Sequence, residues 1–207
     1  MTAPTRWWWV RHARIPGAVG RIYGQTDLGC DTGDLDSFRA LAALLPRNAI
    51  WVISSLRRTR ETADAIATAG MAVPELLIEP QLAEQNFGRW QGLGWEDMQA
   101  TDPVAYAAFW RDPTRNAPPD GESYVAQIGR TRAGIERLTR EHAGRDIVCV
   151  SHGGTIRAAV AVALDLTPET AMAVVIDNLS VTRINFVEDG LLRAHARVWQ
   201  VQGMLTP

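Results

Sequence analysis

Short apolar runs alternate with helix-like patterns along this chain, and this alternation restricts the fold more than any other feature. A short apolar run bounded by polar residues is typical of a strand that is buried on both faces. Strands separated by amphipathic helices form a parallel sheet with helices on both sides. The runs lie at residues 7–10, 50–53, 76–78 and 147–150. The sequence therefore predicts a three-layer α/β/α fold with a mostly parallel central sheet.

Helical periodicity occupies the intervals between these runs, and two further strands are predicted near the end of the chain. Pro46 follows one helical pattern, and Gly70 and Gly144 follow two others, as residues that end helices commonly do. The predicted helices span residues 35–45, 57–69, 122–142 and 155–164, and the last two strands span 180–187 and 194–201 with a turn at 188–190.

One stretch, at about residues 85–121, differs from the rest because it is rich first in aromatic residues and then in proline. It shows no strand pattern, so we expect an insertion folded over the edge of the sheet where α/β proteins bind ligands. There is no internal repeat and no low-complexity linker. We therefore predict a single domain over residues 1–207.

The charge and the cysteine usage exclude several classes of protein. A net charge of -2 and a pI near 6.1 argue against nucleic-acid and membrane-surface binding. No apolar run approaches the roughly 20 residues that span a bilayer, and the N-terminus does not resemble a signal peptide. The two cysteines form no C-x-x-C pair. We expect a cytoplasmic protein without nucleic-acid or membrane partners, and the oligomeric state is not predictable from the sequence.

Polar residues follow three of the predicted strands directly. Arg11 and His12 follow the first, residues 54–58 with Arg58 follow the second, and residues 151–154 with His152 follow the fourth. Parallel strands have their carboxyl ends at one edge, where open α/β sheets bind ligands. Two histidines and at least two arginines are therefore expected to meet there.

These residue types suit a phosphoryl group, which carries about two negative charges. Arginine forks bind two phosphate oxygens at once, and Gly153 and Gly154 would let the N–H groups of a helix N-terminus approach an anion. A neutral imidazole can form a covalent intermediate. The carboxyl group of Glu84, which we expect at the end of the third strand, is the best-placed acid for a leaving oxygen.

At this point the chain resembles the histidine phosphatase superfamily, also called the phosphoglycerate mutase-like family. Five segments match its boxes in order and cover nearly the whole chain. They are Arg11-His12-Ala13 for R-H-G, residues 55–63 for S-x-L-x-R-x-x-x-T-A, residues 84–92 for E-x-x-F-G-x-W-E-G, residues 150–157 for V-S-H-G-G-x-I-R, and residues 120–123 with Arg130 for a G-E-S helix entry. The smaller bacterial members, such as α-ribazole phosphatase-like and broad-specificity enzymes, are most similar.

The resemblance implies a phosphoglycerate mutase-like fold and a role for each matching residue. His12 would take the phosphoryl group, and Arg11, Arg58 and His152 would bind its oxygens. Glu84 would act first as the general acid and then as the general base for water. The substrate-binding set would also include Gly153 and Gln25. No metal or organic cofactor is implied, because the arginines supply the positive charge.

The first box departs from the family pattern. Ala13 replaces the usual glycine, and Ile15 and Ala18 stand where a threonine and a phosphate-binding asparagine are common. We therefore expect a remodelled loop over residues 13–27.

Three functions remain open. A phosphomonoester hydrolase acting on a small phosphorylated metabolite is favoured, because mutases carry a longer insertion with basic residues and this one is compact and contains no lysine. Phosphoglycerate mutase-type transfer and non-catalytic binding of a phosphorylated ligand are the alternatives. The insertion contains three arginines that are candidates for holding a second anionic group or are simply solvated: Arg89, Arg111 and Arg115.

Overall fold

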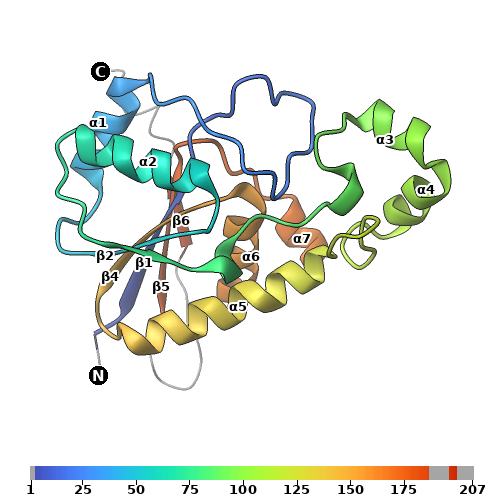
Figure 1. The fold of residues 1–207 in the computed structure, drawn as a ribbon. Helices are drawn as coiled ribbons and strands as arrows, with labels where there is room; N and C mark the ends of the chain where they lie inside the picture. The colour runs from blue at the N-terminus through green and yellow to red at the C-terminus, as the bar shows by residue number, and fades with distance from the viewer. Residues whose placement is uncertain (1–2, 187–195, 200–207) are drawn as a thin grey trace.

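A six-stranded sheet runs through the computed structural model, which describes residues 3–186 and 196–199 (Figure 1). Its strand order is β3-β2-β4-β1-β5-β6. The first four strands in that order are parallel to one another, and β5 and β6 each run antiparallel to the preceding strand in it. The strands are β1 Thr5–Arg11, β2 Ile50–Ile53, β3 Leu76–Ile78, β4 Asp146–Ser151, β5 Val181–Phe186 and β6 Ala196–Trp199. The predicted mostly parallel sheet is thus confirmed.

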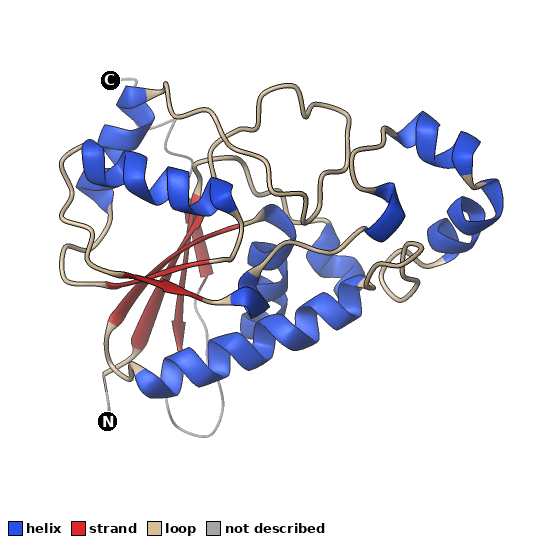
Figure 2. Ribbon diagram, viewed as in Figure 1, coloured by secondary structure: helices blue, strands red, loops and turns tan. Residues whose placement is uncertain are grey.

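Helices cover both faces of the sheet, as Figure 2 shows. Alternate residues of each strand point to opposite faces, so Val148 and Val150 of β4 belong to one apolar cluster and Ile147 and Cys149 to the other. The first cluster includes side chains of α1 and α2, and the second includes side chains of α5 and α6. The helix bounds are α1 Leu35–Leu44, α2 Arg57–Thr68, α5 Tyr124–Glu141, α6 Gly153–Leu164 and α7 Pro168–Met172. The predicted three-layer arrangement is confirmed.

Two predicted helix starts are wrong by two residues, and a local polar contact explains the first. Helix α5 begins at Tyr124 because the Ser123 side chain caps it, accepting a hydrogen bond from the Ala126 N–H at 3.2 Å. Glu122, the predicted start, lies outside the helix. Helix α6 begins at Gly153, directly after His152, and not at Thr155. The turn predicted at residues 188–190 lies outside the described residues. The same is true of residue 187 in the predicted strand 180–187 and of residues 194–195 and 200–201 in the predicted strand 194–201.

The insertion contains short helices that the sequence analysis did not predict. A 3-10 turn, η1 (Pro80–Leu82), precedes it, and η2 (Gly88–Trp90), α3 (Trp95–Thr101) and α4 (Pro103–Arg111) lie within it. Trp90, Met98 and Phe109 form a small buried cluster of their own, against which Ile22 packs. Figure 1 shows α3 and α4 standing apart from the sheet. The insertion therefore has its own small core.

Candidate active site

The two histidines of the sequence boxes lie side by side because their strands do. Strands β1 and β4 pair with Arg11 opposite Ser151, so His12 and His152 leave the sheet at the same edge. Their ring centroids are 5.3 Å apart. Both side chains are fully buried, and each has polar or charged neighbours: Arg58 and the Ser54 hydroxyl bond to His152, and the charges of Arg58 and Arg11 act on His12. The structure thus brings together two residues that are 140 positions apart in the chain.

The His12 ring has a defined orientation. Its Nδ1 atom lies 2.7 Å from the Ala13 carbonyl oxygen, so Nδ1 donates a proton there and Nε2 keeps its lone pair. Nε2 is buried and has no hydrogen-bond partner among the described residues. Burial, and then the charge of Arg58, lowers the pKa of His12 to about 3. The ring is therefore neutral at pH 7, with one unshared electron pair available.

Arg58, in the first turn of α2, is a fully buried cation beside both rings. Its Nε–H donates to Nδ1 of His152 at 3.2 Å. Its two terminal nitrogens donate to the carbonyl oxygens of Thr26 and Gly24, at 2.9 and 2.7 Å. The guanidinium also lies 5.2 Å from the centroid of the Tyr23 ring. Arg58 thus joins the second histidine to the remodelled loop.

His152 bonds to the protein through both ring nitrogens. Nδ1 accepts from Arg58, and Nε2 donates to the Ser54 hydroxyl at 2.7 Å. Burial, followed by the charge of Arg58, holds the pKa of His152 well below its usual range. A contact between His152 and a phosphate oxygen stays a prediction, since it requires a proton on Nδ1. Ser54 was not predicted as a site residue, although it lies directly after the second strand and just before the matched box.

Arg11 and its surroundings open onto a cavity of about 460 Å³, referred to below as the larger cavity. One terminal nitrogen of Arg11 donates to the Ile176 carbonyl oxygen at 2.6 Å, while its buried Nε has no partner among the described residues. Three further arginines line this cavity, together with Asn178, which donates to the His12 carbonyl oxygen at 2.7 Å. These arginines are Arg14, Arg21 and Arg157. The cavity is therefore suited to an anion.

Glu84 lies at the site, but not at the end of the third strand as predicted. Strand β3 ends at Ile78, and the η1 turn carries the chain onward to Glu84. One carboxylate oxygen accepts from the side chain of Gln127 at 3.1 Å and from the Gln85 N–H at 2.9 Å. The other accepts from the Gly154 N–H at 3.2 Å. The carboxylate is thus held by three donors in one orientation.

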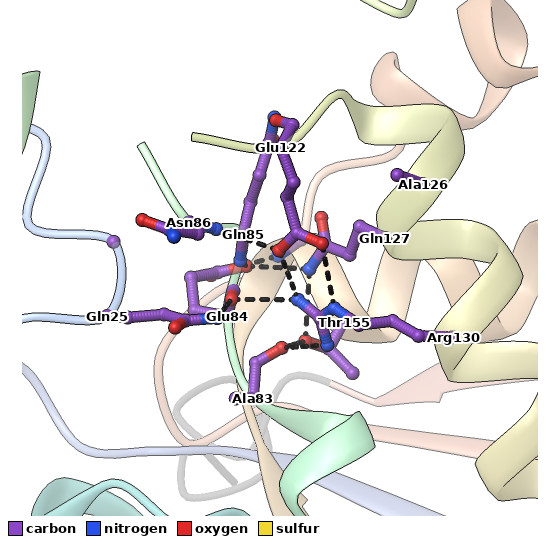
Figure 3. A network of polar contacts seen from close by, with 12 residues as sticks. Gln25, Ala83, Glu84, Gln85, Asn86, Glu122, Ala126, Gln127, Arg130 and Thr155 are labelled. Atoms are coloured by element: carbon purple, nitrogen blue, oxygen red, sulfur yellow. Dashed lines mark hydrogen bonds and ion pairs between the residues drawn. The ribbon is translucent and has the colours of Figure 1, made fainter. Parts of the chain in front are cut away.

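A partly buried polar network fixes the backbone on both sides of Glu84 (Figure 3). Arg130 donates to the carbonyl oxygens of Ala83 and Glu84, at 2.8 and 2.9 Å. It also forms two bonds with the Glu122 carboxylate, at 2.9 and 2.7 Å, and Glu122 accepts from the Asn86 N–H. The Glu122 and Arg130 of the fifth box therefore support the Glu84 segment.

Gly154 of the fourth box serves a different purpose from the predicted one, whereas substrate binding by Gly153 stays a prediction. A Cβ at Gly154 would lie 2.3 Å from a Glu84 carboxylate oxygen, so only glycine leaves room for that carboxylate. The Gly154 N–H donates to Glu84 and is not available to an anion in this arrangement, which corrects the prediction. Gly153 is buried beside Arg11.

The remodelled loop is attached to the insertion. Gln25 donates its side-chain N–H to the Glu84 carbonyl oxygen at 2.8 Å, and its backbone N–H bonds to Gln91. Ile22 exchanges backbone hydrogen bonds with Gly92 and Leu93, at 2.6 and 3.0 Å. Gln25 therefore lies at the site, where it connects the loop to the segment that carries Glu84.

The arginines of the insertion do not line the larger cavity. Arg89 pairs with Asp120 at 3.0 Å, and Arg115 pairs with Glu169 at 2.6 Å, both at the surface. Arg157, which the sequence analysis did not select, lines the cavity instead. Within the described residues, no group of three or more His, Cys, Asp or Glu side chains is arranged to hold a metal ion, and no helix is long and apolar enough to cross a membrane.

The sheet order and the paired histidines at its carboxyl edge define an α/β protein of the phosphoglycerate mutase-like class. Residues 7–197 match the model of the histidine phosphatase superfamily (branch 1), so the chain belongs to that family.

Three comparisons illustrate its relatives. A metal-independent phosphoserine phosphatase of Arabidopsis thaliana is 33% identical over 72% of this chain and 64% of its own. A glucosyl-3-phosphoglycerate phosphatase of Mycolicibacterium vanbaalenii is 35% identical over 76% of this chain and 73% of its own. The α-ribazole phosphatase of Shigella flexneri shares the fold, with a TM-score of 0.81, 24% identity and coverage of 94% of this chain and 95% of that one. The chain spans less than two thirds of the length of the curated relatives matched first.

Proposed function

We propose that this protein is a phosphomonoester hydrolase that acts on a small phosphorylated metabolite through a phosphohistidine at His12. The observation that carries the proposal is the unshared electron pair on Nε2 of His12, buried beside Arg11 and Arg58. An imidazole kept neutral and held by its other nitrogen is an activated nucleophile. Its relatives among phosphoserine and glucosyl-3-phosphoglycerate phosphatases support the same reaction class.

In the first step, Nε2 of His12 attacks phosphorus, the bond from phosphorus to the ester oxygen breaks, and Glu84 gives that oxygen its proton. The unpartnered Nε–H of Arg11 and the guanidinium of Arg58 would bind the other phosphate oxygens. Nε2 is buried, so substrate entry requires a neighbouring side chain to shift, and Tyr23, which lines the larger cavity and whose ring centroid is 6.2 Å from that of His12, is a candidate.

In the second step, Glu84 takes a proton from water, the water oxygen attacks phosphorus, and the bond to Nε2 breaks. Phosphate leaves and His12 is again neutral. Two arginines close to the phosphoryl group supply the charge that a metal ion supplies in other phosphatases. We therefore expect a chelator to leave the rate unchanged, and a strict requirement for Mg²⁺ would contradict the proposal.

The test is phosphate release from 3-phosphoglycerate and from p-nitrophenyl phosphate, with His12→Ala as the blank. The proposal predicts free phosphate from the wild-type protein and a rate for His12→Ala that is lower on the order of 10⁵-fold or more. Formation of 2-phosphoglycerate would instead support a mutase. Tight binding of phosphorylated compounds without turnover would support the non-catalytic alternative. The fold of His12→Ala is checked by circular dichroism.

A further inference from the structure

A second cavity, of about 200 Å³, adjoins the larger one at the acid residue and is called the smaller cavity below. Four residues line both cavities. They are Glu84, Phe87, Trp95 and Arg157. Glu84 thus contributes to the walls of both cavities.

The chemistry of the proposed reaction fixes what each cavity would receive. In phosphoryl transfer the attacking and leaving atoms lie roughly in line with phosphorus. With His12 as the nucleophile and Glu84 as the acid, the leaving oxygen lies beside Glu84. The carbon skeleton attached to that oxygen then begins beside Glu84, where the smaller cavity offers a largely apolar space.

The walls of the smaller cavity are mostly apolar. Besides the shared Phe87 and Trp95, they include five further apolar or aromatic residues. These are Phe109, Trp110, Pro113, Tyr124 and Met172. The two charged groups in the wall, Glu84 and Arg157, have opposite signs, so the cavity has no excess of positive charge that would favour a second anionic group. A cavity of roughly 150 Å³ holds a benzene molecule in another protein, so this one has room for a single ring.

Tyr124 also lines the smaller cavity. Its side chain is buried, and its hydroxyl group has no hydrogen-bond partner among the described residues. Burial raises the pKa of Tyr124, so the hydroxyl stays protonated. A buried hydroxyl without a partner costs free energy.

We propose that the smaller cavity binds the alcohol portion of the substrate and selects phosphomonoesters of ring-bearing, largely apolar alcohols over small or anionic ones. The proposal rests on the proposed hydrolysis. Burying a phenyl ring stabilises a complex by an amount that corresponds to a rate advantage on the order of 10- to 100-fold. The anchoring residues come from the insertion, from α5 and from α7, and not from the sheet edge.

The experiment compares 2-phenylethyl phosphate, ethyl phosphate and 3-phosphoglycerate. The first two release primary alcohols of similar acidity, so their ratio of kcat/KM reports binding of the ring. We expect 2-phenylethyl phosphate to be favoured by about 10- to 100-fold over ethyl phosphate. Equal values for the two, or a preference for 3-phosphoglycerate, would overturn the proposal while leaving the hydrolase assignment intact. No phosphate from any of them, or from p-nitrophenyl phosphate, would instead refute the hydrolase itself.

Two variants locate the effect. Trp110 lines the smaller cavity at the end of α4 and is 43% exposed, so Trp110→Ser is expected to fold. We expect it to lower the ratio between the two substrates to below about three, because it removes one wall of the ring site. Val104 lies on the same helix, is exposed and lines neither cavity, so Val104→Ser is the matched control and should keep the wild-type ratio. An unchanged ratio in Trp110→Ser would contradict the proposal.

Discussion

The sheet edge and the insertion differ in how they hold their residues. At the sheet edge, His12 and His152 follow paired strands, and every ring nitrogen except Nε2 of His12 bonds to a neighbouring group. In the insertion, short helices pack around Trp90 in a small cluster, and exposed aromatic rings such as Trp95 and Trp110 face the cavities.

This difference indicates that the two regions have separate roles. The sheet edge fixes groups that would act on any phosphoryl group, and its geometry follows from the strand register. The insertion and the attached loop surround the place where the remainder of a substrate would lie. Substitutions at the edge should therefore lower the rate for all substrates, whereas substitutions in the insertion should change the ratio between substrates.

Apart from His12→Ala, the largest effect is expected for Arg58→Ala. Loss of a preorganised charge partner typically costs on the order of 10²- to 10³-fold in kcat, and we expect this loss for ring-bearing and small substrates alike. Arg57→Ala is the matched control, because Arg57 precedes it on the same helix and its side chain is 64% exposed. Steady-state kinetics on both substrates check the prediction. A loss confined to one substrate would contradict the separate roles of the sheet edge and the insertion.

Arg130→Met tests the segment that joins the two regions. The variant removes the support of the Ala83 and Glu84 carbonyl groups, so we expect kcat to fall by about tenfold for ethyl phosphate. The loss should be smaller for p-nitrophenyl phosphate, whose leaving group needs less help from an acid. Arg132→Met, on an exposed position of the same helix, is the control. Equal losses on both substrates would indicate general destabilisation and not displacement of Glu84.

The lowered pKa of His12 also predicts how the free energy of unfolding depends on pH. Because the pKa of His12 is lowered from 6.5 to about 3 in the folded state, the unfolded state binds more protons between these values. Stability due to this group is therefore present above pH 6.5 and is lost as the pH falls toward 3. The slope amounts to about 1.4 kcal/mol per pH unit. Urea unfolding at pH 4 to 7 should show a shallower dependence for His12→Asn, and identical slopes would refute the lowered pKa.

The smallest effect on turnover is expected for Trp90→Ala in the insertion. Trp90 is 2% exposed within the small cluster, so its loss should loosen the insertion and the attached loop. We expect faster amide hydrogen exchange at residues 88–111, no change in β4, and a few-fold fall in kcat/KM for ethyl phosphate. Joint acceleration of exchange in β4 would show that the two regions unfold as one.

The sheet and the convergence of the boxes could be predicted from the sequence because both depend on local signals. Apolar runs mark strands. The residue that follows a strand lies at the edge of the sheet where that strand ends, as His12 and His152 do. The same rule failed for Glu84, because the η1 turn lies between the strand and the carboxylate.

The remaining parts carry weaker signals. Helices α3 and α4 contain seven and nine residues, too few for a clear apolar period. Ser54, Gln127, Asn178 and Arg157 are single polar residues whose positions depend on the tertiary fold. A signal for Gln127 did exist, because it lies on α5 three residues before the matched Arg130.

The most direct test of the account is to identify the phosphorylated atom during turnover. The protein is mixed with excess p-nitrophenyl phosphate and quenched in alkaline denaturant within milliseconds, and the product is analysed by ³¹P NMR and by mass spectrometry of peptides. The account predicts one phosphoryl group on Nε2 of His12, because Nδ1 donates to the Ala13 carbonyl oxygen. A phosphoryl group on Nδ1 or on another side chain, or turnover without any phosphorylated protein, would contradict it.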